Sequence, residues 1–165
     1  MVSESAIALA PLLPGRSVAD LTALCSVKAQ SVQPVEAVPL HPLLTQLSAD
    51  YALGVMTNDA EQAARDQLAR CGITALFRAI IGFDSGHGAK PDAAPLLAFA
   101  RLIDTAPADI VMVGDSSHDL HAAKAAGCIP LGVLTGPAGA DDLRAAGAEA
   151  VLDNIGQLPF FLAHR

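Results

Sequence analysis

The sequence predicts an α/β protein with a doubly wound parallel sheet. After residue 38, apolar runs typical of buried strands alternate with amphipathic helical stretches, at a spacing that suits right-handed βαβ units. The composition agrees, because 52% apolar and 16% charged residues in a chain of 165 allow one sizeable core and exclude global disorder.

The expected strands and helices follow one another in a regular order. Residues 51–56 form a short, nearly continuous apolar run, typical of a strand covered on both faces. Residues 59–71 carry one apolar helical stripe, with Asp59 and Gln62 at capping-box spacing and Gly72 closing the helix. The remaining expected elements are strands at 79–83, 110–113, 129–134 and 150–152, and helices at 93–104, 117–126, 141–146 and 155–162.

The N-terminal residues 1–37 differ from the rest of the chain. Ser17 and Asp20 form a capping box before an amphipathic helix, and Pro34 ends that stretch. Leucines at 40–47 then indicate another helix, which leads into the first clear strand. Since no strand is expected before it, the N-terminal segment is predicted to be a small helical appendage.

Charge, cysteines and hydropathy limit the classes of function. Ten basic against seventeen acidic side chains, without a Lys/Arg cluster, argue against a nucleic-acid or membrane surface. Cys25, Cys71 and Cys128 lie too far apart for a zinc motif and form no disulfide framework, which predicts buried thiols in a reducing compartment. The apolar stretch 6–13 is too short to span a bilayer and follows no positive charge, so a cytoplasmic protein is expected.

Two loops after expected strands carry groups that suit an anion, because doubly wound sheets bind ligands beyond the carboxyl ends of their strands. Thr57 and Asn58 follow the first strand, where a hydroxyl and free backbone N–H groups could hold phosphate. The alternative is that Asn58 or Asp59 caps the next helix. Lys90 stands in a glycine-rich loop before Pro91, where it could neutralise a phosphate and a nearby carboxylate. A solvent-exposed lysine is the alternative there.

The sequence Val-Gly-Asp-Ser-Ser-His-Asp is the strongest signal. Asp115 falls at the end of a buried strand and Asp119 in the first turn of the next helix, and two converging carboxylates suit a hard cation such as Mg²⁺. A capping box between Ser116 and Asp119 explains Asp119 without a metal, but it leaves Asp115 without a partner. His118 and His121 are interpreted as solvent-facing side chains rather than a metal-binding pair.

In this order, the three motifs resemble the haloacid-dehalogenase-like (HAD) hydrolase superfamily. Thr-Asn follows a strand, Lys-Pro follows a glycine loop, and Gly-Asp-Ser-x-x-Asp-Leu precedes a helix. The resemblance extends over residues 38–156 and is greatest to the phosphoglycolate-phosphatase-like branch, which has a helical cap. It implies a Rossmann-like, HAD-like core at residues 38–165 and a partial helical cap at residues 1–37.

The resemblance also implies roles for individual residues. Thr57 and Asn58 would bind the phosphate, and Lys90 would act as the catalytic lysine that steadies the transferring phosphoryl group. Asp115 would be a Mg²⁺ ligand, and Asp119 would support the metal directly or through water. The paired acids favour a Mg²⁺-dependent phosphatase that acts on a small phosphorylated metabolite, a phosphate monoester, over a metal-free dehalogenase.

The sequence departs from the family pattern at the nucleophile. Family chemistry proceeds through an aspartyl-phosphate formed by the first Asp of an Asp-x-Asp-Gly-Thr motif, and no Asp in these 165 residues has another Asp two positions away. With that motif one Mg²⁺ ligand is also missing, so weak Mg²⁺ binding and impaired catalysis are expected. Two hypotheses remain open: the larger part of a phosphatase whose nucleophile lies upstream, or a non-catalytic module that binds phosphate or a partner.

In the family, the strand that carries this motif lies between the strands expected here at 51–56 and 110–113. Without it, these two strands would pair with each other, borrow a replacement, or leave ladder groups unpaired in the core. Residues 6–13 are one candidate replacement, although Pro11 speaks against a central strand. Because an unpaired strand edge can pair with another chain, we also expect a homodimer that covers an open sheet edge.

Overall fold

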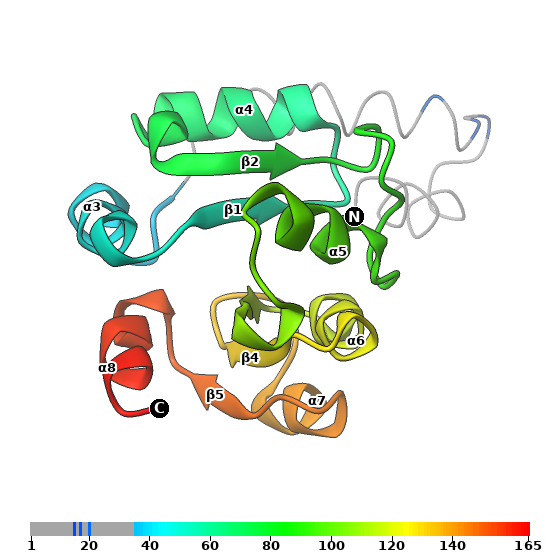
Figure 1. Cartoon of the computed structure of the whole chain (residues 1–165). Coiled ribbons are helices and arrows are strands. Elements are labelled where there is room, and N and C mark those ends of the chain that lie inside the picture. Colours follow the sequence, from blue (N-terminus) through cyan, green and yellow to red (C-terminus); the bar gives the residue numbers. More distant parts are fainter. Residues whose placement is uncertain (1–14, 16, 18–19, 21–34) are drawn as a thin grey trace.

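The computed structural model describes Gly15, Ser17, Asp20 and residues 35–165, in which helices and parallel strands alternate (Figure 1). The strands are β1 (Leu53–Met56), β2 (Phe77–Ile81), β3 (Val111–Gly114), β4 (Ile129–Val133) and β5 (Ala150–Leu152). The α-helices are α3 (Leu40–Asp50), α4 (Glu61–Arg70), α5 (Ala94–Leu102), α6 (Ser117–Ala126), α7 (Ala140–Ala145) and α8 (Leu158–Ala163). Short 3₁₀ helices lie at η2 (Thr74–Leu76), η3 (Pro107–Asp109) and η4 (Ile155–Gln157).

The strands form two parallel sheets. β1 pairs with β2, and β3, β4 and β5 form a second sheet in that order. Parallel strands with helical crossovers confirm the predicted α/β class. The expected sheet is split between β1 and β3, because no strand of the described residues lies between them. Of the three outcomes expected for these two strands, pairing with each other is excluded, while a replacement strand from residues 6–13 lies outside the described residues.

The local patterns placed most elements within two residues of where they lie. The helix at α6 and the strand at β5 have the expected bounds. β2 was expected at 79–83 but ends at Ile81, because the Gly82 N–H donates to the Ser85 hydroxyl and the chain turns away from the sheet there. The last expected helix, at 155–162, begins instead with the 3₁₀ turn η4.

The expected capping box of Asp59 and Gln62 is wrong. Helix α4 begins at Glu61, and the N–H of Glu61 donates to the Asp84 carboxylate, 2.8 Å away in the loop after β2. The Gln62 amide donates instead to Asp66 on the same helix. The cap of α4 thus comes from a loop 23 residues along the chain.

The capping box predicted at the N-terminus is confirmed. The backbone N–H and hydroxyl of Ser17 both donate to the Asp20 carboxylate, at 3.2 and 2.7 Å, and the Asp20 N–H donates back to the Ser17 hydroxyl. The rest of that helix, its end at Pro34 and the candidate strand at 6–13 lie outside the described residues. The proposed division into a cap at 1–37 and a core at 38–165 therefore stays a prediction.

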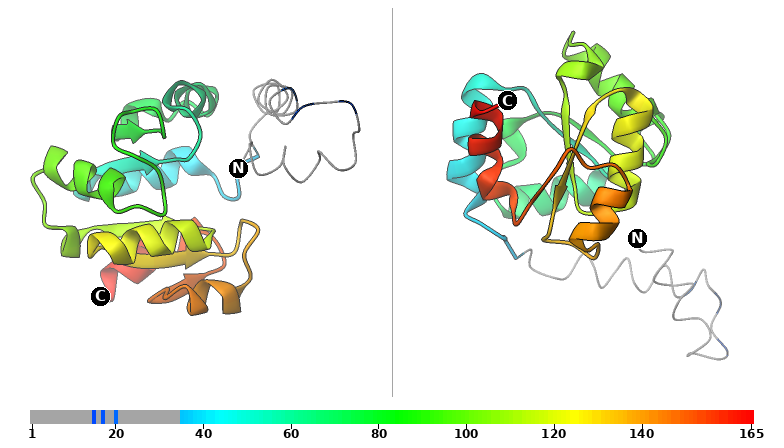
Figure 2. Two further views of the ribbon diagram at one scale, coloured as in Figure 1. Left: turned by 90° about the vertical axis from the view of Figure 1, so that its right-hand side faces the viewer. Right: turned by 90° about the horizontal axis from the view of Figure 1, so that it is seen from below.

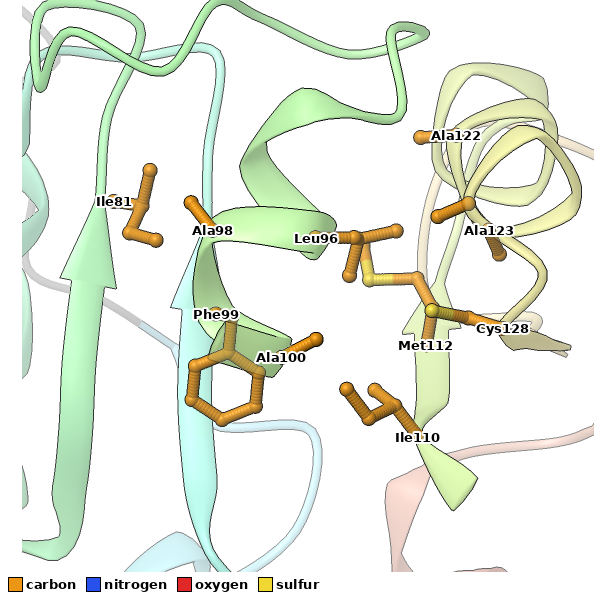
Figure 3. Packing of buried hydrophobic residues seen from close by; sticks show 11 residues of the cluster. Ile81, Leu96, Ala98, Phe99, Ala100, Ile110, Met112, Ala122, Ala123 and Cys128 are labelled. Atoms are coloured by element: carbon orange, nitrogen blue, oxygen red, sulfur yellow. The ribbon is translucent and has the colours of Figure 1, made fainter. Parts of the chain in front are cut away.

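Helix α5 connects the two sheets through the largest buried cluster. Leu96 and Phe99 lie between Ile81 of β2 and Met112 of β3 (Figure 3). The Phe99 ring packs so closely on β1 that a Cβ on Gly54 would come within 2.6 Å of it. Helices α3 and α8 lie together on the opposite face of the sheets (Figure 2), where they share a second buried cluster. The sheets are therefore covered on both faces, as their apolar strands predicted.

Candidate active site

Lys90 joins the carboxyl ends of the two sheets. Its Nζ donates to the main-chain oxygen of Met56, at the end of β1, over 2.7 Å. The same Nζ lies 2.5 Å from Oδ1 of Asp119, in the helix that follows β3. The side chains of Lys90 and Asp119 are only 13% and 7% exposed, so a solvent-exposed lysine is excluded.

Asn58 holds the main chain of Lys90. Its Oδ1 accepts from the Lys90 N–H and its Nδ2 donates to the Lys90 carbonyl, both over 2.9 Å. The alternative in which Asn58 or Asp59 caps helix α4 is wrong, because the N-cap is Ala60 and the Glu61 N–H donates to Asp84. Asn58 therefore positions the lysine loop, a role that the sequence motif did not reveal.

Thr57 stands where β1 ends. Its N–H completes the ladder to the Ile81 carbonyl over 2.9 Å, and its hydroxyl oxygen accepts from the Asp59 N–H over 3.0 Å. Because the hydroxyl accepts in this turn, its own hydrogen can be donated to an anion beyond the strand.

Asp119 both caps the start of helix α6 and forms the ion pair with Lys90. Its Oδ2 accepts from the N–H and the hydroxyl of Ser116, at 3.2 and 2.7 Å, so the predicted capping box is confirmed. Its other oxygen, Oδ1, accepts a hydrogen bond from the Lys90 ammonium group. A Cβ on Gly114 would lie 2.1 Å from the Cβ of Asp119, so only glycine allows the helix to start this close to β3.

Asp115 is the carboxylate at the site without a side-chain partner among the described residues. Burial raises its pKa above the ordinary range for aspartate, and the negative charge of Asp119 raises it further. The positive charge of Lys90 lowers that pKa in part. Its carboxylate packs against Gly136, where a Cβ would come within 2.1 Å of Oδ2. A half-buried carboxylate of this kind is stabilised by a cation.

The site fits a divalent cation only in part. Within the described ranges, no group of three or more His, Cys, Asp or Glu side chains could hold a metal ion. Both oxygens of Asp119 already accept hydrogen bonds, which leaves Asp115 as the better placed ligand. His118 and His121 are exposed on α6, as interpreted from the sequence. A complete Mg²⁺ shell would need oxygen ligands beyond these two carboxylates.

Three of the five expected site residues line one cavity. Lys90, Asp115 and Asp119 all line a cavity of about 660 Å³ between the two sheets. Thr57 and Asn58 do not line it, but they follow Met56, whose carbonyl accepts a hydrogen bond from Lys90. The structure thus brings the phosphate- and metal-binding candidates together at the carboxyl ends of β1 and β3.

Of the three cysteines expected to be buried, Cys128 is buried and Cys71 is partly buried. Cys71 and Cys128 are free thiols, and burial raises the pKa of Cys128; Cys25 lies outside the described residues. In the part of the chain that the structure describes, no helix is long and apolar enough to cross a membrane.

Known proteins share both the sequence and the fold. The haloacid dehalogenase-like hydrolase profile matches residues 23–133. A phosphoglycolate phosphatase of Neisseria meningitidis is 43% identical over 84 residues, which cover 51% of this chain and 36% of the relative. The crystal structure of a predicted phosphoglycolate phosphatase from Haemophilus somnus has a TM-score of 0.79 at 23% identity, over 88% of this chain and 65% of that one. A HAD family hydrolase of Deinococcus radiodurans, solved with bound phosphate and sodium, has a TM-score of 0.76 at 24% identity, over 97% of this chain and 74% of that one.

The profile, the strand-end motifs and the fold agree, and the chain belongs to the haloacid dehalogenase-like hydrolase family. The curated relatives that it matches at 36–43% identity include phosphoglycolate phosphatases. The chain spans about a third to a half of the length of the curated relatives that it matches.

Replacing Lys90 by Met tests the ion pair that joins the sheets. The substitution leaves the Asp119 carboxylate buried without its cation, so the free energy of unfolding in urea should fall by about 3 kcal/mol. The control is Lys124→Met on the exposed side of α6, which should change that free energy by less than about 0.5 kcal/mol. Equal stability of the Lys90→Met variant and the unchanged chain would contradict this description of the site.

Replacing Asp115 by Asn tests the raised pKa. A raised pKa in the folded state means that the contribution of Asp115 to stability is present below its unfolded pKa, about 3.9, and is lost as the pH rises through the folded value. In metal-free buffer, Asp115→Asn should therefore stabilise the chain at pH 7, and this gain should shrink on acidification. Urea unfolding across pH 3–8 measures it, with the exposed Asp92→Asn as the control. A gain that grows toward acid pH would overturn the assignment.

Proposed function

We propose that this chain is the phosphate- and metal-binding part of a Mg²⁺-dependent phosphatase that acts on a small phosphate monoester. The observation that carries the proposal is the buried Lys90 ammonium group, held between the end of β1 and Asp119 with Asp115 beside it. A fixed cation at the carboxyl ends of two parallel strands suits a group as negative as phosphate.

Each residue has a separate part in this proposal. The Thr57 hydroxyl donates to a phosphate oxygen, and the Lys90 ammonium group offsets the charge of the phosphoryl group and of Asp119. Asn58 keeps the lysine in place through its two hydrogen bonds to the main chain. Asp115 binds Mg²⁺, and Asp119 supports it through Lys90 and the start of α6. When bound, Mg²⁺ would neutralise charge on the phosphate oxygens.

The names of the relatives support a substrate of the phosphoglycolate type. The Neisseria protein is called a phosphoglycolate phosphatase, and the Deinococcus structure holds phosphate. A cytoplasmic setting belongs to the same proposal, supported by the free thiols of Cys71 and Cys128.

A second candidate is a non-catalytic module that binds phosphate or a partner. The absence of any Asp-x-Asp pair from these 165 residues favours it, because such a chain holds no nucleophile for the aspartyl-phosphate route. The two candidates predict the same ligands at Lys90 and Asp115 and differ only in turnover.

Hydrolysis of p-nitrophenyl phosphate with Mg²⁺ separates the two candidates. The 165-residue chain alone should show negligible turnover, since positioning groups without the nucleophile retain only a small part of the rate enhancement. A version extended upstream by a strand that ends in Asp-x-Asp-Gly-Thr should turn over. Asp115→Asn in that version should lower the rate on the order of a hundredfold by weakening the metal site.

Robust Mg²⁺-dependent turnover by the 165-residue chain would contradict the impaired-enzyme proposal. No hydrolysis of any phosphomonoester by either version would favour the binding module instead.

A further inference from the structure

The loop between β4 and α7, residues 134–139, crosses the side chain of Asp115. A Cβ added to Gly136 would overlap Oδ2, Cγ and Cβ of Asp115, and these are the three heavy atoms nearest to it. The main chain at Gly136 is therefore in direct contact with the whole carboxymethyl group of Asp115. The space that any other residue would need at position 136 is occupied by a carboxylate of the candidate site.

The backbone conformation does not explain the glycine at this position. The φ of Gly136 lies outside the left-handed range, so an L side chain would meet no backbone strain there. The opposite holds at Gly86 and Gly127, which have φ values of 81° and 75° and where a Cβ would meet no atom within 4 Å. Space for Asp115, rather than a turn, is what requires glycine at position 136.

The loop is held on both sides of this glycine. The Leu134 N–H donates to the Leu152 carbonyl at the end of β5, over 3.0 Å. After the glycine, Ala138 packs against the third buried cluster, formed by Leu120, Leu143 and Ala146. In addition, the ring of Pro137 fixes its own φ directly after the glycine. These restraints oppose a movement of the loop away from Asp115.

Both carboxylates of the site pack against a glycine in this way. A Cβ on Gly114 would overlap the side chain of Asp119, as one on Gly136 would overlap that of Asp115. Gly114 belongs to the strand that precedes the two aspartates, whereas Gly136 comes from the loop after the next strand. A side chain held by packing on one side has fewer conformations open to it, which prepares the group for binding.

We propose that Gly136 is a positioning residue of the site: by lacking a Cβ, it lets Asp115 keep the conformation in which its carboxylate lines the cavity with Lys90 and Asp119. The loop 134–139 thereby sets where this carboxylate can meet a cation. The inference rests on the proposed function for the identity of the cation, Mg²⁺. The steric coupling between Gly136 and Asp115 does not depend on it.

A double-variant cycle in the 165-residue chain tests the coupling. Gly136→Ala should lower the urea concentration at the midpoint of unfolding by about 0.5 M or more, because the overlap with Asp115 has to be relieved. In a chain that carries Asp115→Gly, the same substitution should shift the midpoint by less than about a third as much, since no side chain remains to be met.

Gly139 supplies the matched control in the same loop. Its φ of −77° is open to alanine, and its Cβ would come only within 3.5 Å of the Asp142 carboxylate. Gly139→Ala should therefore shift the midpoint equally with and without Asp115→Gly.

The carboxyl carbon of Asp115, observed by ¹³C NMR, gives a readout that a general loss of stability would not move. Without metal, its resonance should shift in Gly136→Ala and stay in place in Gly139→Ala. In a titration with Mg²⁺ under conditions where each variant is folded, Gly136→Ala should weaken the affinity reported by this carbon about tenfold or more. Gly139→Ala should leave that affinity unchanged.

The inference is overturned if Gly136→Ala lowers the midpoint equally in the Asp115→Gly background. It is also overturned if the Asp115 carbon has the same resonance and the same Mg²⁺ affinity in the two alanine variants. If Mg²⁺ does not shift this carbon even in the unchanged chain, the metal-binding part of the proposed function fails. In that case the cycle and the metal-free resonance decide the inference, which coupling supports and independence of the two positions overturns.

Discussion

The ion pair between Lys90 and Asp119 is the interaction on which the rest of the site depends. It links the end of β1 to the helix that follows β3, across a boundary that no described strand bridges. A nearly buried pair compensates for its desolvation only when further hydrogen bonds satisfy both partners. The Met56 carbonyl does this for the lysine, and Ser116 does it for the aspartate. Among the described residues, Asp115 has no such side-chain partner, so it is the carboxylate that a cation would stabilise most.

The same boundary divides the fold. The apolar contacts of α5 hold the two sheets together on one face, and α3 and α8 pack across the other. These helices and the strands β1 and β3 line a cavity of about 660 Å³. Thr57 and Asp115 directly follow β1 and β3, the two described strands that border this boundary.

Local sequence patterns predicted most of the fold, because period and capping residues act over a few positions. The helix Ser117–Ala126 begins at its own capping box and ends at Gly127, which adopts the left-handed conformation. Both ends could therefore be predicted from the sequence. The contacts that position Lys90 could not be predicted from local sequence patterns. Asn58 binds it from 32 residues away, and Asp84 caps α4 from 23 residues away. Such pairs depend on how distant loops pack together beyond the ends of the strands. The periodicity of apolar residues carries no information about this packing. The convergence of Lys90 and Asp115 was predicted only through the topology of parallel strands.

An NMR titration with inorganic phosphate in the presence of Mg²⁺ tests most directly whether these groups form one phosphoryl site. We expect saturable shifts, with a common affinity, for the amides of Thr57, Asn58 and Asp115 and for the Lys90 side chain. Shifts confined to other parts of the surface, or different affinities at Thr57 and Asp115, would contradict this expectation.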